Sequence, residues 1–206
     1  MTTSHHAPFA APLPHRVDPE LPEMWVVRHG ATEWSRNGRH TSTTDLPLLP
    51  EGEEGAIALR ERLAEVEFAE VWASPRQRAR RTAALAGFES PEIVEDLAEW
   101  DYGDYEGMTR AQVHEEKDPT WAVWTHGCPG GESPRQVAAR LDRVVERARA
   151  ASGPVLAFAH GHSLRVLAVR WLDLPVAEGR HFHLDTTTIS VLGTDRGLRE
   201  VRRWNA

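Results

Sequence analysis

Two histidines follow strand-like apolar runs, and each is followed directly by a glycine. The segment MWVVRHG covers residues 24–30, and VLAFAHG covers residues 155–161. A histidine can act as a nucleophile, a general base or a metal ligand, and the glycine after it lets backbone or ligand approach closely. Because ligands of open α/β sheets bind at the carboxyl ends of the strands, we expect Arg28, His29 and His160 to share one rim.

A third basic element lies in ASPRQRARRT, residues 73–82. Ser74 can cap a helix, Pro75 suits its first position and Gln77 can complete a capping box. Such a start places Arg78 in the first turn, where unpaired backbone N–H groups already favour an anion. The pattern predicts an anion-binding arginine, with a solvated basic helix face as the alternative.

An acidic loop, LAEWDYGDYEG, occupies residues 97–107. Its carboxyl groups belong to Glu99, Asp101, Asp104 and Glu106. A carboxyl group beside a reacting centre can serve as a general acid or base, whereas a solvated loop needs no such role. His160 could equally be a core histidine with a backbone partner. Only the combination of these features indicates a reaction site.

Rival chemistries have less support in the residue pattern. Two pairs of histidines are spaced two residues apart, which on a strand would place both side chains on one face, as metal ligands require. These pairs are His160 with His162 and His181 with His183. No clear carboxylate completes either set. Cys128 does not fit the cysteine-dependent phosphatases, because its spacing to Arg135 is too long and Pro134 stands where the arginine is required. No Walker-type glycine loop supports nucleotide hydrolysis.

Composition bounds the molecule further. The chain has 206 residues, which suits one sizeable α/β domain. Its formal net charge of −7 argues against a nucleic-acid binder. No apolar run approaches the roughly 20 residues of a membrane helix, and the single cysteine fits a reducing cytoplasm. We read residues 1–22 as a flexible tail, because so polar and proline-rich a segment cannot offset its ordering entropy, and 23–206 as one domain.

Strand-like and helix-like segments alternate along this domain. Strands are predicted at 24–29, 69–75, 89–96 and 155–160, and helices at 49–66, 75–87, 131–150 and 163–174. Residues 187–204 read as a hairpin that turns between Thr194 and Gly197, and residues 96–132 as an irregular insertion over the sheet. This alternation predicts an α/β fold of three layers, α/β/α, with a mostly parallel central sheet.

Several motifs agree in order and spacing with those of one family. The motifs are VVRHG with Thr32 and Trp34, SPRQRARRTA, EWDYGDYEG, GGES and FAHGHSLR. They make the chain resemble the histidine phosphatase superfamily, the phosphoglycerate-mutase-like proteins. The resemblance covers residues 24–206 and is greatest to the sedoheptulose-1,7-bisphosphatase branch and its bacterial relatives. It implies the phosphoglycerate-mutase-like form of the three-layer fold and a histidine-dependent phosphatase.

The resemblance also implies how the phosphoryl group is handled. His29 matches the nucleophile, which forms a phosphohistidine while a backbone carbonyl holds its other ring nitrogen. Arg28 and Arg78 match the arginines that bind the transferring phosphoryl group. His160 matches a further donor to its oxygens. The family reaction needs no metal and no cofactor.

The leaving group needs a proton, because alkoxides leave poorly. Glu99 matches the acid of the family, whereas Glu106 reads as structural. The negative charge of bound phosphate favours a protonated carboxyl group beside it, so the sequence predicts a mildly acidic optimum.

Substrate contacts follow less directly from the residues. The candidates for phosphate or substrate binding are Ser35, Thr41, Gly161 and Arg165. Other basic groups, which could engage a second phosphate or lie at the surface, are Arg39, His40 and His126. Trp121 and Trp124, three apart on an expected short helix, could wall the pocket over a sugar or pack in the core.

The expected function is a metal-independent phosphomonoesterase of small phosphorylated metabolites, such as sugar phosphates or bisphosphates, in the cytoplasm. Two alternatives stay open: a 2,3-bisphosphoglycerate-dependent phosphoglycerate mutase, and a phosphate-binding interaction protein with weak catalysis. True mutases of the family have a longer insertion after the catalytic glutamate, and the intact reactive residues argue against lost catalysis. The expected partner is the small phosphorylated substrate, without nucleic acid or membrane. A homodimer through an edge strand is compatible with the fold.

Overall fold

The computed structural model describes residues 21–206. Within them one sheet contains β1 (Met24–Arg28), β2 (Glu70–Ala73), β3 (Glu92–Ile93), β4 (Val155–Ala159), β5 (Ile189–Asp195) and β6 (Leu198–Arg203). The α-helices are α1 (Glu33–Asn37), α2 (Pro50–Leu63), α3 (Gln77–Leu85), α4 (Arg110–Glu116), α5 (Val123–His126), α6 (Pro134–Arg149) and α7 (Gly161–Trp171). Three 3-10 helices are η1 (Glu95–Leu97), η2 (Gly103–Tyr105) and η3 (Val176–His181). The tail predicted at 1–22 lies almost wholly outside the described residues.

The strand order is β3-β2-β4-β1-β5-β6. β1 to β4 run parallel, whereas β5 pairs antiparallel with β1 and β6 antiparallel with β5. The predicted mostly parallel sheet is confirmed. The register sets Arg28 opposite Ala159. His29 and His160 therefore leave neighbouring strands at the same edge of the sheet.

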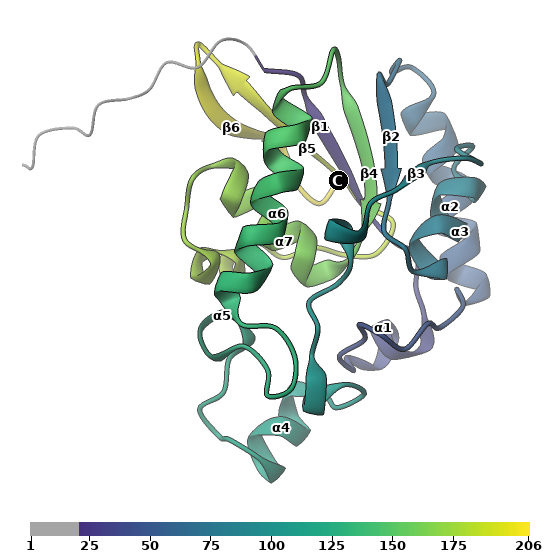
Figure 1. The fold of residues 1–206 in the computed structure, drawn as a ribbon. Helices are drawn as coiled ribbons and strands as arrows, with labels where there is room; N and C mark the ends of the chain where they lie inside the picture. Colours follow the sequence, from purple (N-terminus) through teal and green to yellow (C-terminus); the bar gives the residue numbers. More distant parts are fainter. Residues whose placement is uncertain (1–20) are drawn as a thin grey trace, which may run out of the picture.

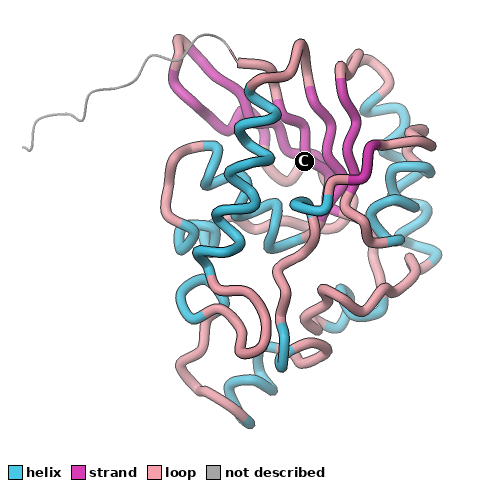
Figure 2. Tube along the Cα trace, viewed as in Figure 1, coloured by secondary structure: helices cyan, strands magenta, loops and turns pink. Residues whose placement is uncertain are grey.

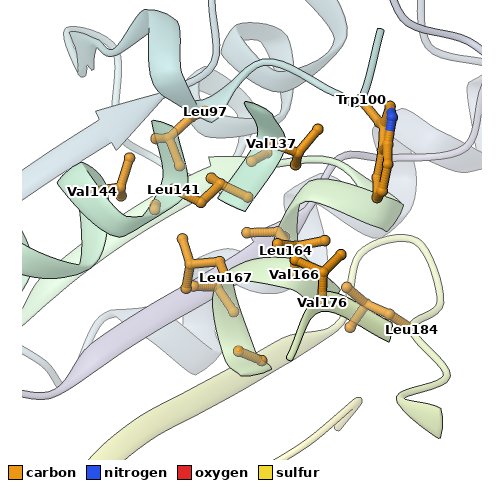
Figure 3. Close-up of a cluster of buried hydrophobic side chains, with 14 of the residues drawn as sticks. Leu97, Trp100, Val137, Leu141, Val144, Leu164, Val166, Leu167, Val176 and Leu184 are labelled. Atoms are coloured by element: carbon orange, nitrogen blue, oxygen red, sulfur yellow. The ribbon is translucent and has the colours of Figure 1, made fainter. Parts of the chain in front are cut away.

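Helices cover both faces of this sheet, as the three-layer prediction requires. Figure 1 shows α2 and α3 on one face and α6 and α7 on the other. The first face buries a cluster that includes Val27, Leu59 and Phe158. The second buries the apolar stripe of α6, including Leu141, against Leu164 and its neighbours on α7 (Figure 3). Two buried faces hold the central strands, and therefore their carboxyl ends, in fixed positions.

The start of α3 differs from the prediction. Its N-cap is Arg76, without a side-chain cap, so the expected capping box of Ser74 and Gln77 is wrong. The carboxylate of Asp45 accepts the Gln77 N–H at 2.9 Å instead. A residue distant in sequence thus satisfies a free donor of the first turn. Arg78 still lies in that turn.

Three other boundaries depend on tertiary contacts or turns. The third strand shrinks from 89–96 to the two residues of β3, because the chain turns into η1 at Glu95. The hairpin is confirmed, with its turn at Arg196 and Gly197, whose φ angles of 49° and 77° suit a tight two-residue connection. Trp124 lies in α5, but Trp121 precedes it.

The insertion between η1 and α6 contains only short helices joined by loops (Figure 2). Glycines with positive φ, such as Gly103 and Gly107, allow its turns. Among residues 21–206 no helix combines the length and apolar character needed to cross a membrane.

Candidate active site

His29 follows the last residue of β1 and is only 5% exposed. Its Nδ1 lies 2.8 Å from the carbonyl oxygen of Gly30. Because a carbonyl can only accept, the ring proton is on Nδ1, and Nε2 keeps its lone pair. His29 also lines a cavity at this edge of the sheet. The nitrogen left free for attack therefore belongs to a side chain at the cavity wall.

The surroundings of His29 keep the ring neutral. Burial lowers the pKa of His29 well below 6.5, and the nearby cations of Arg78 and Arg28 lower it further. The hydrogen bond to the Gly30 carbonyl opposes this shift but has the smaller effect. A neutral imidazole with a free lone pair is the form that a nucleophilic histidine requires.

Gly30 explains why a glycine follows the histidine here. A Cβ on this residue would lie 2.4 Å from the carbonyl oxygen of Gly52, on α2. The Gly30 N–H also donates to the hydroxyl of Thr82, on α3, at 3.0 Å. Close contact with two helices thus fixes the backbone, including the carbonyl that holds His29.

Arg28 places a guanidinium in the wall of the same cavity. One of its terminal nitrogens donates to the carbonyl of Leu184 at 2.6 Å, and its buried Nε has no acceptor among the described residues. Gly161 lies beside it, and a Cβ there would be in ordinary contact with the Arg28 Cζ at 3.4 Å. Burial lowers the pKa of Arg28, but nearby Glu99 opposes the shift. An unpaired N–H donor of this kind suits a phosphoryl oxygen.

His160 and Arg78 form a fully buried pair behind His29. The rings of His29 and His160 have centroids 5.1 Å apart. The Nδ1 of His160 accepts from the Arg78 Nε at 3.2 Å, so its proton is on Nε2 and donates to the hydroxyl of Ser74 at 2.7 Å. Both residues have no exposed surface, and neither lines the cavity that His29 lines. In this arrangement Arg78 acts on the site through its charge, which lowers the pKa of His29.

Glu99 lies in the loop between η1 and η2, its carboxylate contacts the first turn of α7, and it also lines the cavity. Its Oε1 accepts from the N–H groups of Ser163 at 2.8 Å and Trp100 at 2.9 Å, and its Oε2 from the N–H of His162 at 3.1 Å. Arg140 holds the backbone of this residue by donating to the Glu99 carbonyl at 3.2 Å. Oε2 carries only one of the three bonds, so this oxygen has room for a proton.

The cavity beside these residues has a volume of about 480 Å³. Aromatic and histidine rings form one wall: His40, Tyr102, Trp121, Trp124 and His162. Among the described residues, Glu99 supplies the one carboxylate that lines the cavity. Five arginines line it: Arg28, Arg39, Arg110, Arg165 and Arg180. In a chain of net negative charge this concentration of cations favours an anionic ligand.

Arg165 lies against the aromatic wall. Its guanidinium carbon is 4.4 Å from the centre of the Trp124 ring, and its Nε donates to the carbonyl of Gly179 at 3.0 Å. Burial lowers the pKa of Arg165 to about 10, so it stays charged at neutral pH. Beside it, the phenol of Tyr102 and the Nδ1 of His162 share a bond of 2.6 Å.

The other predicted substrate contacts also line the cavity, but their hydroxyl groups are engaged. Ser35 donates its hydroxyl proton to the Thr32 carbonyl and accepts the Thr32 N–H, as part of a capping box of α1. Thr41 donates its hydroxyl to the carbonyl of Arg39. Of the extra basic groups, Arg39 and His40 line the cavity and His126 does not.

Arg110, Tyr102 and Arg180 were missed as cavity residues. A capping box formed by Thr109 and Gln112 starts α4 and places Arg110 first in the helix, which offers a weak sequence signal. Nothing in the sequence around Arg180 indicates the cavity.

The predicted alternatives for metal binding have other partners. The ring nitrogens of His160 bond to Arg78 and Ser74, and His183 pairs with Asp185. Within residues 21–206 no group of three or more histidine, cysteine or acidic side chains is placed to hold a metal ion.

Comparison with known proteins identifies the family. The family described as Histidine phosphatase superfamily (branch 1) matches residues 24–206. The chain belongs to this superfamily. The chain is 44% identical over 182 residues to the acid phosphatase of Mycobacterium tuberculosis, which covers 86% of this chain and 89% of that protein. The predicted enzyme class, a histidine phosphatase, is confirmed.

Two further likenesses fit this histidine phosphatase assignment. The chain is 34% identical over 187 residues to sedoheptulose 1,7-bisphosphatase of Saccharomyces cerevisiae, covering 75% of this chain and 69% of the yeast protein. A solved structure of an open reading frame product from Mycobacterium tuberculosis has a TM-score of 0.85 and 42% identity, covering 89% of this chain and 97% of that one. Relatives also include phosphoglycerate mutases, so membership alone does not separate hydrolase from mutase.

Proposed function

We propose that this histidine phosphatase is a metal-independent phosphomonoesterase that acts through a phosphohistidine on His29. The observation that carries the proposal is the bond from Nδ1–H of His29 to the Gly30 carbonyl, which leaves the Nε2 lone pair of a neutral ring at the cavity wall. Arg28 and Glu99 line the same cavity, so an anion-binding group and a proton donor lie in the same site as His29.

In the first step Nε2 of His29 attacks phosphorus, and the bond from phosphorus to the ester oxygen breaks. Protonated Glu99 gives its proton to that oxygen, which leaves as an alcohol. The Nε–H of Arg28 bonds to a phosphoryl oxygen, and the buried charge of Arg78 stabilises the negative charge that spreads over these oxygens.

In the second step the Glu99 carboxylate accepts a proton from water, whose oxygen attacks phosphorus. The bond between phosphorus and Nε2 breaks, which releases phosphate and restores neutral His29 and protonated Glu99. Because its pKa lies well below 6.5, His29 stays unprotonated in mild acid. The mildly acidic optimum remains our prediction, since Glu99 must begin the cycle protonated.

Small sugar phosphates or bisphosphates are the proposed substrates. The cavity volume suits a metabolite of this size. Rings such as Trp121 and Trp124 can cover the carbon face of a sugar, and Arg39, Arg110, Arg165 and Arg180 could bind a second anionic group. The names of the acid phosphatase and sedoheptulose 1,7-bisphosphatase relatives support a phosphatase of this class.

A phosphate-release panel tests the proposal. It includes sedoheptulose 1,7-bisphosphate, fructose 1,6-bisphosphate, 3-phosphoglycerate and an aryl phosphate, all with a chelator present. We expect phosphate release by the protein and by a His126→Ala control, which alters an exposed histidine outside the cavity, but not by His29→Ala. Full activity of His29→Ala would overturn the mechanism.

The same panel separates the alternatives. Conversion between 3- and 2-phosphoglycerate without net phosphate release would favour a mutase, which must shield its phosphohistidine from water. Binding of phosphorylated compounds without turnover would favour an interaction protein. Strong preference for one sugar bisphosphate would identify the substrate class.

A further inference from the structure

The guanidinium of Arg78 is held mainly by one loop, residues 41–45. Besides its bond to His160, Arg78 donates to the carbonyl of Thr41 at 3.0 Å, of Thr44 at 3.2 Å and of Ser42 at 3.4 Å. Because this side chain has no exposed surface, water does not replace these acceptors. The position of a cation that acts on His29 therefore depends on the conformation of the loop.

Glu106 holds the same loop from the other side. Its Oε1 accepts from the N–H groups of Ser42 at 2.9 Å and Thr44 at 3.0 Å. Its Oε2 accepts from the N–H of Ser42 at 2.9 Å and from the Ser42 hydroxyl at 2.7 Å. One carboxylate thus satisfies three donors of a loop that has no regular secondary structure.

The two contacts involve the same residues. Ser42 and Thr44 each give their N–H to Glu106 and their carbonyl to Arg78. The backbone groups point their positive ends toward the carboxylate and their negative ends toward the guanidinium. Each charge favours the orientation that the other needs, and bonds to charged groups are the strong ones in such a network.

We propose that Glu106 is a positioning residue for the reaction, which holds the loop of residues 41–45 so that its carbonyls fix Arg78. This inference rests on the proposed function, because it assigns Arg78 a part in stabilising the phosphoryl charge. It also deepens the reading of Glu106 as a structural residue. A purely structural anchor affects the amount of folded protein, whereas a positioning residue affects turnover through Arg78.

The experiment compares four variants of the full chain on the best substrate of the panel. Glu106→Ala removes both acceptor oxygens and so leaves all three donors without Glu106. Glu106→Gln keeps an oxygen for both N–H groups and offers an amide donor to the Ser42 hydroxyl. Asp104→Asn is the matched control, because Asp104 is an exposed acid of the same acidic segment. Arg78→Lys is made alone and together with each of the others.

We expect Glu106→Ala to lower kcat about 10- to 100-fold with KM changed less than about threefold. Glu106→Gln should lower kcat less than Glu106→Ala does, because it keeps one acceptor oxygen but not the charge. Asp104→Asn should match the unaltered protein. The double variant Arg78→Lys with Glu106→Ala should be no more than about twofold worse than Arg78→Lys alone, because both changes disturb one guanidinium.

The inference would be overturned if the loss of kcat in the double variant equalled the product of the losses in Arg78→Lys and Glu106→Ala. An unchanged kcat in Glu106→Ala would also overturn it. If Glu106→Ala does not fold, Glu106→Asp replaces it, since a carboxylate one methylene shorter cannot reach all the donors. It should lower kcat several-fold and be equally non-additive with Arg78→Lys. Failure of the proposed function is recognised separately, because His29→Ala would then be active or the unaltered protein inactive.

Discussion

β1 and β4 are neighbouring parallel strands that are each followed by the dipeptide His-Gly, yet the two ends differ in chemistry. His29 and His160 are both buried, and burial lowers the pKa of each well below 6.5. The Nδ1 of His29 donates to a carbonyl, so its Nε2 is a free base. The Nδ1 of His160 accepts from Arg78, so its Nε2 is a donor. The partner of one ring nitrogen decides whether the other nitrogen is a free base or a donor.

The glycines differ in the same way. Gly30 is required by the packing of β1 against α2, because backbone atoms of Gly52 occupy the place of a side chain. Gly161 faces the guanidinium of Arg28 at an ordinary contact distance. Packing therefore requires only the first glycine, although the two look alike in the sequence.

The largest difference between the two ends should appear in catalysis. We expect His29→Gln to lower kcat by at least about 10³-fold, because the nucleophile is gone. His160→Gln should lower it about 10²-fold, as for the loss of one stabilising donor. Rapid quenching into alkali during turnover should trap a phosphohistidine in His160→Gln but not in His29→Gln. A trapped intermediate in the His29 variant would reverse the assignment.

The glycines should differ in stability. We expect Gly30→Ala to lower the free energy of unfolding by at least about 2 kcal/mol, because the new Cβ meets backbone that cannot move aside. Gly161→Ala should leave the free energy of unfolding unchanged or raise it by up to about 1 kcal/mol, since the residue begins α7 and alanine favours helix. Urea unfolding of both variants measures this, and equal losses would contradict the comparison.

The lowered pKa values that His29 and His160 share should make the folded protein less stable in acid. Their folded pKa values lie below that of an unfolded histidine, so the unfolded chain binds more protons once the pH falls below about 6.5. The stability is fully present above that pH and is lost as the pH falls toward the folded pKa, at about 1.4 kcal/mol per pH unit for each histidine. Urea unfolding at pH 7 and pH 5 should show a shallower loss in His160→Gln than in the unaltered protein. The same slope in both would show that His160 is protonated in the folded state.

The strand ends could be predicted from the sequence because their signals are local. A short apolar run followed by His-Gly indicates a buried strand and its end, and neighbouring strands bring Arg28, His29 and His160 together. The partners of these side chains could not be predicted in the same way. The cap of α3 comes from Asp45, and the hydroxyl of Ser74 lies 2.7 Å from the His160 ring and only 3.4 Å from the N–H of Arg76 at the helix start.

The cavity wall was harder to predict for a related reason. It combines the insertion, which contains Tyr102 and Trp121, with η3, which contains Arg180. Neither segment has a periodic pattern, and their meeting depends on packing between residues far apart in the chain. That Arg28, His29 and His160 lie together was therefore predictable from motifs, whereas the rest of the cavity wall required the fold.

The smallest effect should come from Ser74, and it tests why His160 differs from His29. In Ser74→Ala the Nε2–H of His160 loses its acceptor, which should lower the free energy of unfolding by about 1 kcal/mol. The bond from Arg78 to Nδ1 remains and still places the proton on Nε2, so the Arg78 guanidinium keeps its position beside His29. We therefore expect kcat within about threefold of the unaltered protein, measured beside urea unfolding. A loss as large as that of His160→Gln would show that Ser74, not Arg78, holds the ring in its supporting role.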